Sequence, residues 1–209
     1  MNIVDDGDAT LDQPLLKPPD HTLLLRAVQQ NAPRIVAAMG AKARLRPVPA
    51  VSVLSAVASL QNVDDHTRQT AVQVLAFLAP LSQTPLPASY AATLATVDDA
   101  MADSHHPMEV LHALLGVRDA KAHERVKGFQ IGVGIAIDLL GDALESAAGV
   151  TSAASVFGRL KPVDVARSCA RGCVFGAMAG SLGSMGANVG AIVGGVGGSA
   201  QAAIEAATT

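Results

Sequence analysis

The segment 105–112, with the sequence HHPMEVLH, holds the side chains of this chain that are best suited to binding a metal ion. On a continuous helix, His105, Glu109 and His112 would occupy positions i, i+4 and i+7 and would share one face. Imidazole and carboxylate groups are common metal ligands, and the Glu-x-x-His spacing recurs in metal sites of helical bundles. Pro107, however, favours a helix that begins after His105. The sequence therefore predicts either a metal site or a polar helix start.

A pair of adjacent carboxylates, Asp64 and Asp65, precedes His66 and Thr67. Two neighbouring carboxylates can hold a divalent cation or act as a catalytic acid and base. The same pattern is also typical of a helix N-terminus, in which the Asp64 carboxylate accepts a hydrogen bond from the backbone N–H of Thr67. Both interpretations remain open at the level of the sequence.

Two short motifs resemble those of the ADP-ribosylglycohydrolases. The run VDDHT at 63–67 is similar to the Thr-Asp-Asp-Thr metal motif of that family, and GDAL at 141–144 is similar to its Gly-Asp-Ala-Leu element. The resemblance implies a metal-dependent hydrolase that uses Asp64, Asp65 and Asp142. In this chain the two elements stand in the opposite order, and the late Asp-x-Asp-Thr motif of the family is absent.

The longest uncharged part of the chain lies between Arg171 and Glu205, where 33 residues include ten glycines. Helical positions four apart lie on nearly the same face, so glycines at this spacing form a groove without side chains. The backbone of another helix can approach such a groove closely. The glycines that fall four apart are Gly172, Gly176 and Gly180 and, after Gly183, Gly186, Gly190, Gly194 and Gly198.

These glycines make an isolated helix unstable in water. Each glycine costs roughly 1 kcal/mol relative to alanine in a helix interior, so ten cost on the order of 10 kcal/mol. The segment therefore needs close packing against a partner helix, a bilayer that penalises unpaired backbone groups, or a nonhelical structure. The helix expected to serve as the partner is the apolar segment 129–149.

The glycine series resembles the glycine zippers of membrane-inserting bacterial proteins. That resemblance implies a segment that inserts into a bilayer or oligomerises there, as in a pore-forming effector or toxin. The late pair Ile204 and Glu205, after a run of small residues, is also similar to the Tim family of membrane translocases. The charged motif that this family carries between its helices is not evident here.

The segment 129–149 carries Asp138, Asp142 and Glu145 at i, i+4 and i+7. On a helix they form one acidic stripe. In a bilayer this stripe must face a partner or a water-filled lumen, whereas in a protein that stays in water it is a solvated face.

Composition excludes several classes of function. Aromatic residues make up only 2% of the 209 residues, Trp is absent and the net charge is −3, which argues against nucleic-acid binding. No cofactor is expected, because the glycine-rich run 194–199 lacks the lysine of a phosphate-binding loop. Cys169 and Cys173 stand four apart and are expected to be buried thiols, with a metal or redox pair as the alternative.

Helix-start and helix-stop residues predict an all-α fold, with short helical hairpins followed by a glycine-rich helical hairpin. Asp20, Pro49, Asp64, Pro87 and Pro107 mark helix starts. A helix that begins at Asp64 is expected to end at Pro80. The expected organisation is a flexible arm at 1–19, a helical domain at 20–117 and a glycine-zipper region at 118–209.

Three functions follow as hypotheses. The leading one is a protein that inserts conditionally into membranes or oligomerises through its glycines, and that is not an enzyme. The alternatives are an all-α interaction module that uses glycine for helix packing, and a metal-dependent hydrolase. The expected partners are membrane lipid, a partner helix or further copies of the chain. The acidic start MNIVDDGDATLDQ does not read as a secretory signal, so we expect synthesis in the cytoplasm, followed by membrane association or export without a cleavable signal.

Overall fold

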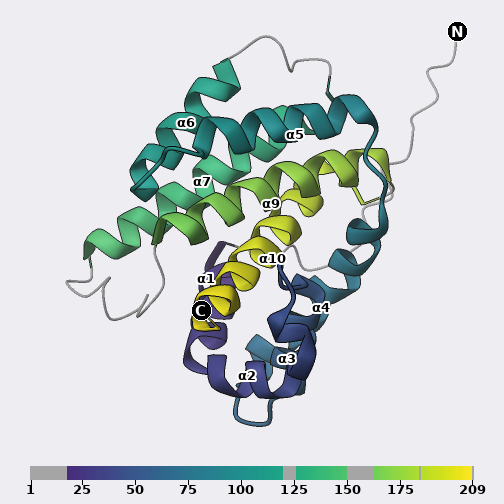
Figure 1. Cartoon of the computed structure of the whole chain (residues 1–209), viewed down its shortest axis with the longest axis vertical. Helices are drawn as coiled ribbons and strands as arrows, with labels where there is room; N and C mark the ends of the chain where they lie inside the picture. Colours follow the sequence, from purple (N-terminus) through teal and green to yellow (C-terminus); the bar gives the residue numbers. More distant parts are fainter. Residues whose placement is uncertain (1–17, 120–125, 150–161, 184, 209) are drawn as a thin grey trace, which may run out of the picture.

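A computed structural model describes residues 18–119, 126–149, 162–183 and 185–208, and these residues form helices and connections without strands (Figure 1). The predicted all-α class is therefore confirmed. The elements are α1 (Pro18–Gln30), α2 (Ala32–Met39), the 3-10 helix η1 (Gly40–Arg44), α3 (Ala50–Ser59), α4 (Asp65–Gln83), α5 (Ala88–Met101), α6 (Pro107–Asp119), α7 (Phe129–Gly149), α9 (Pro162–Leu182) and α10 (Ala187–Ala207).

Prolines and polar caps set most of the helix starts. Asp64 caps α4, Pro87 directly precedes α5, and Pro107 is the first residue of α6. Pro80 differs from the expectation, because α4 continues past it to Gln83. A proline so close to the C-terminal end removes only one helical hydrogen bond, so the last turn still forms.

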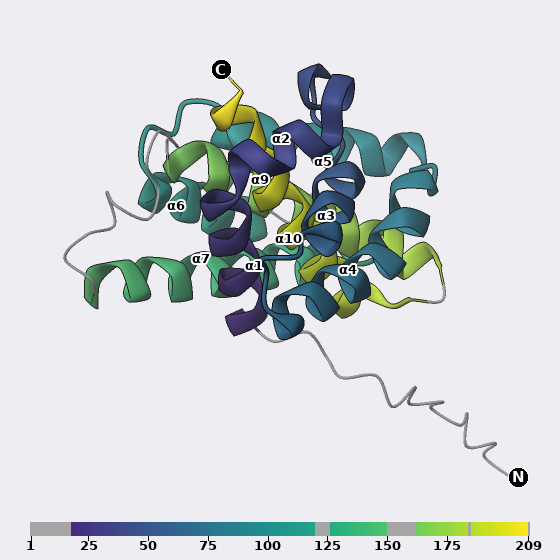
Figure 2. The same ribbon diagram turned by 90° about the horizontal axis from the view of Figure 1, so that it is seen from below.

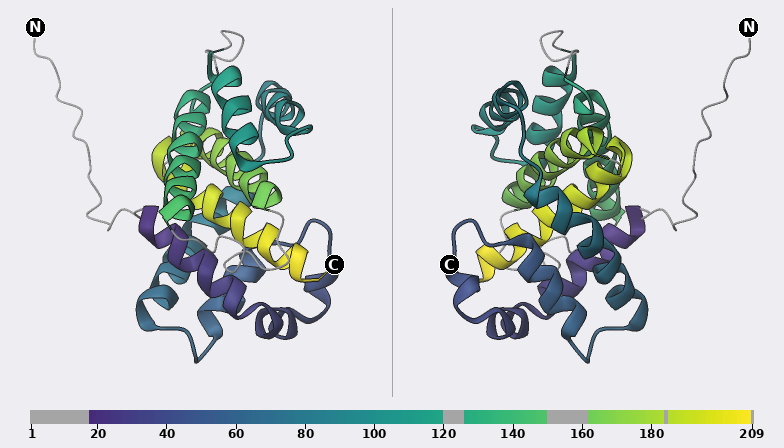
Figure 3. Two further views of the ribbon diagram at one scale, coloured as in Figure 1. Left: turned by 90° about the vertical axis from the view of Figure 1, so that its left-hand side faces the viewer. Right: turned by 90° about the vertical axis from the view of Figure 1, so that its right-hand side faces the viewer.

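Helices α9 and α10 form an antiparallel hairpin through the middle of the molecule. Figure 1 shows α5 and α6 above α9, α7 crossing one end of α9, and α1–α4 around the lower part of α10, and the side views of Figure 3 show α10 passing between the two groups. The buried side chains form two clusters that match this arrangement. One cluster joins α1–α4 to α10, and the other joins α5–α7 to α9.

This distribution of the core differs from the expected domain organisation. Helices α5 and α6 fall within the expected helical domain at 20–117, yet their buried residues share a cluster with α7 and α9. Conversely, α10 lies in the expected glycine-zipper region and packs against α1–α4. Among the described residues, each of the two clusters therefore contains side chains from both sides of the expected boundary at residue 118.

Candidate functional site

The glycines of α9 and α10 pack directly against one another. A Cβ atom added to Gly172 would overlap the carbonyl oxygen of Gly194 and lie 2.7 Å from its carbonyl carbon. A Cβ on Gly194 would lie 2.8 Å from the carbonyl carbon of Gly172, so the contact is reciprocal. Gly176 and Gly190 form a second reciprocal pair, at 2.7 and 2.8 Å by the same measure. The two backbones thus touch at successive turns.

One end of this interface contains a residue that the predicted glycine series did not include. A Cβ on Gly198 would lie 2.7 Å from the carbonyl carbon of Ser168, which precedes Gly172 by four residues. Counting serine as a small residue would have extended the series to Ser168. At the other end, Gly180 faces Gly186, whose φ of +81° places it before the first turn of α10 rather than inside the helix.

Segment 129–149 was predicted to be the partner of the glycine series. In the structure it forms α7 and packs mainly on another face of α9. In α7, a Cβ on Gly132 would lie 2.8 Å from the Cα of Val174 and 2.9 Å from the Cβ of Ala177. Gly128, with φ +80°, approaches the backbone of Ala177 just before α7 begins. The glycine series of α9 and α10 are thus each other's partners, and α7 adds a second close contact.

Both cysteines are buried in α9 beside the glycine interface. A Cβ on Gly195 of α10 would lie 2.5 Å from the Sγ of Cys173 and 3.6 Å from the Sγ of Cys169. The thiols are free, as the sequence favoured. A hydrogen bond with Cys169, together with burial, raises the pKa of Cys173 well above its ordinary value. Cys173 therefore remains protonated at neutral pH, and both thiols are buried packing residues.

The three residues of the predicted acidic stripe, Asp138, Asp142 and Glu145, belong to α7. Asp138 is exposed to solvent. The side chains of Asp142 and Glu145 lie outside the described residues. Of the three residues, only Asp138 has a described side chain, so the acidic stripe stays a prediction.

The residues of the predicted metal site are not brought together. Helix α6 begins at Pro107, so His105 precedes it and cannot share its face with Glu109 and His112. The Glu109 carboxylate turns back instead, and its Oε2 accepts hydrogen bonds from the backbone N–H groups of His105 at 2.6 Å and His106 at 3.3 Å. Among the described residues, no three His, Cys, Asp or Glu side chains converge on a metal-sized site. The cap explains the Glu109 position, and the metal prediction is not supported.

The cap on α6 makes the stability of the protein depend on pH. Backbone hydrogen bonds, first from His105, hold the pKa of Glu109 below its ordinary value of 4.5. A carboxylate with a lowered pKa stabilises the fold above its unfolded pKa, and that stabilisation is lost as the pH falls through the folded pKa. We expect Glu109→Gln to have a lower melting temperature than the wild type at pH 7. The difference in melting temperature should decrease as the pH falls below about 4.5. A gap independent of pH in thermal melts would show that the charge of Glu109 does not contribute.

Asp64 and Asp65 are occupied by local contacts. Asp64 accepts hydrogen bonds from the Thr67 backbone N–H at 2.8 Å and from the Thr67 hydroxyl at 2.7 Å. These bonds hold the pKa of Asp64 below its ordinary value, chiefly through the Thr67 hydroxyl. Asp65 pairs with Arg68 at 2.7 Å. The helix-cap interpretation therefore accounts for the positions of both residues.

Two arginines of α9 hold the α5–α6 region against the central hairpin. Arg167 donates hydrogen bonds to the carbonyl oxygens of Ala102, at 2.9 Å, and Ser104, which follow α5. Arg171 forms an ion pair with Asp98 of α5 at 3.0 Å. The uncharged part of α9 starts directly after Arg171. Contacts with α10 begin at Ser168 and continue into this part, so the charged half of α9 attaches both the α5–α6 region and α10.

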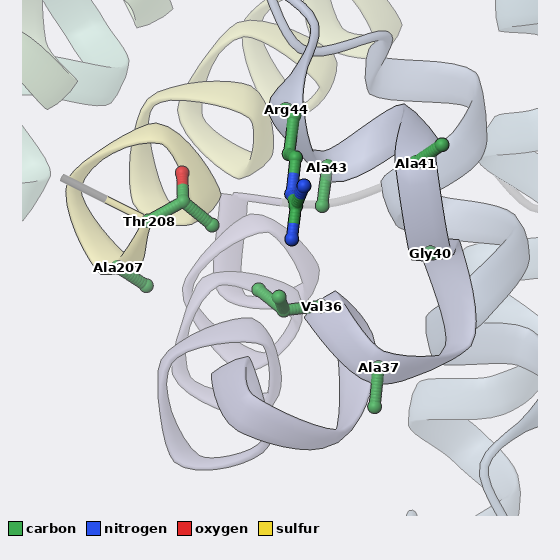
Figure 4. Close-up of a pocket in the computed structure, with 8 residues that line it drawn as sticks. All are labelled: Val36, Ala37, Gly40, Ala41, Ala43, Arg44, Ala207 and Thr208. Carbon is green, nitrogen blue, oxygen red and sulfur yellow. The ribbon is translucent and has the colours of Figure 1, made fainter.

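A hollow of about 640 Å³ lies between α2, η1 and the C-terminal end of α10 (Figure 4). Its walls are mostly small apolar side chains, and Arg44 is the one charged residue among the described residues that line it. Figure 4 shows the Arg44 side chain pointing toward Val36, with Thr208 on one side and Ala43 on the other. The lining residues are Val36, Ala37, Gly40, Ala41, Ala43, Arg44, Ala207 and Thr208.

Within the described parts of the chain, no helix is both long enough and apolar enough to cross a membrane. The glycines that lengthen the uncharged segment also lower its hydropathy, and the segment is divided between two helices.

Comparison with known proteins gave no matching family model and no curated protein or solved structure with significant similarity to this chain.

Proposed function

We propose that the protein is a non-enzymatic helical interaction module, in which the α9–α10 hairpin is a rigid spine and the outer helices provide the binding surfaces. The observation that carries this proposal is the reciprocal contact between the glycine backbones of α9 and α10. Both glycine faces are occupied within one chain. A second copy or a foreign helix could use these faces only if the hairpin opened.

The positions of the candidate catalytic groups also favour a binding function over hydrolysis. Asp64 caps α4, Asp65 pairs with Arg68, and Glu109 caps α6. Each carboxylate already has a structural role that satisfies its hydrogen-bonding capacity in part. A hydrolase using these residues would first have to release the helix ends that they hold.

A second candidate, conditional insertion into a bilayer, is favoured by the composition and position of α10. Residues 187–204 carry no charge, and most of the buried residues of α10 lie under α1–α4 and α9. Insertion would require these outer helices to move away and would expose the apolar faces that now form the two core clusters. The two candidates therefore differ in whether the hairpin stays closed.

One pair of measurements separates the two candidates. The full chain is examined by sedimentation velocity in detergent-free buffer and by dye release from vesicles of phosphatidylcholine and phosphatidylserine. If the protein is an interaction module, we expect sedimentation velocity to show a monodisperse monomer. We also expect no dye release from the vesicles, even if the protein binds to them. Dye release comparable to that caused by a lytic peptide would overturn the proposal in favour of insertion. Aggregation that only detergent prevents would also contradict it.

A further inference from the structure

We propose that the segment 40–47, here called the basic connector, docks the protein on an anionic phospholipid surface. This inference rests on the proposed function, because it names the partner of one surface of the module. The connector comprises η1 and the residues that lead to α3. It lies beside α2 and the C-terminal end of α10, which Figures 1 and 2 show close to each other.

The first argument is the charge of this part of the chain. Residues 21–63 contain five basic residues and no Asp or Glu, although the whole chain has a net charge of −3. The excess of positive charge is thus concentrated in α1, α2 and the basic connector. The five residues are Arg26, Arg34, Lys42, Arg44 and Arg46, and all are exposed.

The second argument is that most of these cations are not used by the fold. Arg46 is used, since it donates hydrogen bonds to the carbonyl oxygens of Ala43 and Leu45 and to the Thr208 hydroxyl. The side chains of Lys42 and Arg44 have no hydrogen-bond or ion-pair partner among the described residues. Arg46 therefore fixes the connector in place, and Lys42 and Arg44 remain available to an anionic partner.

The third argument is the exposure of Leu45, which stands between two arginines. Its relative exposure is 51%, among the highest of the large hydrophobic side chains. An apolar side chain flanked by cations suits the bilayer interface, where the cations meet lipid phosphates and the apolar group enters the acyl boundary. The hollow beside Arg44, lined by small apolar side chains, offers further apolar surface to a lipid.

The connector is also held firmly enough to act as a preformed surface. Ala43 is 1% exposed and anchors η1 in the core. At the end of the connector, the backbone N–H of Val48 donates a hydrogen bond to Glu205 of α10 at 2.7 Å. Because the backbone is fixed at both points, binding costs little additional ordering of the chain.

A lipid surface fits these groups better than the other polyanions do. Single-stranded nucleic acids are bound by aromatic stacking platforms, and segment 40–47 has no aromatic residue. The C-terminal end of α10 contributes partial negative charge near Arg46. This charge disfavours an anion enclosed in a pocket at that position. A few exposed cations around one leucine are instead typical of peripheral membrane contact, to which each cation near an anionic surface adds about fivefold in affinity.

The test measures co-sedimentation of the full-length protein with phosphatidylcholine vesicles, with and without phosphatidylserine. We expect binding only to vesicles that contain phosphatidylserine, and weaker binding at high salt. The double variant Lys42→Gln/Arg44→Gln should bind about 25-fold more weakly, from about fivefold for each charge. The matched control, Arg118→Gln/Lys127→Gln, removes two exposed cations from the α6–α7 region and should retain wild-type binding.

A second pair of variants tests the apolar contact. Leu45→Ser should weaken vesicle binding several-fold, whereas Val72→Ser should not, although Val72 on α4 is equally exposed at 53%. Because all of these side chains are exposed, circular dichroism should show the same helical content in each variant. Equal effects of the two double variants would overturn the assignment of the surface, as would binding to phosphatidylcholine alone.

The possible failures are distinguishable. If the protein is monodisperse, does not bind the vesicles and binds soluble polyglutamate, the partner of the basic connector is an acidic peptide instead of a lipid. The proposed interaction module would then still hold. If the protein is monodisperse and binds neither the vesicles nor polyglutamate, the docking inference is wrong and the interaction module is unaffected. Vesicle binding followed by dye release would retain the docking surface and overturn the closed module.

Discussion

Gly176→Ala should destabilise the protein by at least about 3 kcal/mol, the largest effect expected from the addition of a single methyl group. The new Cβ would overlap the carbonyl oxygen of Gly190 and lie 2.7 Å from its carbonyl carbon. Both atoms belong to helix backbone, so no side-chain rotation relieves the overlap and α9 must move away from α10. For a chain of this size the melting temperature should fall by roughly 6–12 °C.

The control for this variant is Gly116→Ala in α6. A Cβ on Gly116 would meet nothing within 4 Å, and the position is exposed. Alanine should therefore stabilise α6 by up to about 1 kcal/mol through its helix propensity. If Gly176→Ala melted at or above the wild-type temperature, α9 and α10 would not be in backbone contact, and the spine of the proposed module would be wrong.

Gly132→Ala in α7 should also destabilise the protein, by about 2–3 kcal/mol, at the contact between α7 and α9. The Cβ would lie 2.8 Å from the Cα of Val174 and 3.0 Å from the carbonyl oxygen of Cys173. The nearest atom at Gly132 is thus 2.8 Å away, whereas a Cβ on Gly176 would overlap a carbonyl oxygen, so α7 can shift by a smaller amount to accommodate the methyl group. The shift would loosen the cluster around α7 and α9, which includes the fully buried Phe129.

Gly134 provides the matched control on the same helix. It lies two residues further along α7, and a Cβ there would meet nothing within 4 Å. Chemical denaturation should show Gly134→Ala unchanged or more stable by up to about 1 kcal/mol, and Gly132→Ala less stable. Equal effects of the two substitutions would mean that helix propensity, rather than the approach of α7 to α9, determines the outcome.

Local physical chemistry explains why much of the fold could be predicted. Pro87, Pro107 and Asp64 act on the backbone of their own helix, so their meaning does not depend on the rest of the molecule. Pro80 shows the limit of such local rules. Its cost depends on how many hydrogen bonds follow it, and helix ends are the least certain part of a sequence-based assignment.

The candidate site could be predicted less completely, because the same residue types serve several purposes. Glu109 has the spacing of a metal ligand, but the start of α6 at Pro107 turns its carboxylate toward the backbone of His105. The basic residues of the connector lie close together in the sequence. Their position beside the end of α10, and the use of Arg46 alone to hold it there, depend on contacts between residues about 160 positions apart in the chain.

The sequence by itself determined that this chain is helical and that Gly172, Gly176, Gly190 and Gly194 form faces without side chains. A glycine face fixes how closely another backbone can approach, but it carries no side chain that could select the partner. Only the tertiary structure decided that α9 and α10 would supply these faces to each other, with α7 on a further face of α9. Because α9 ends at Leu182 and α10 begins at Ala187, the two series can face each other in antiparallel order within one chain.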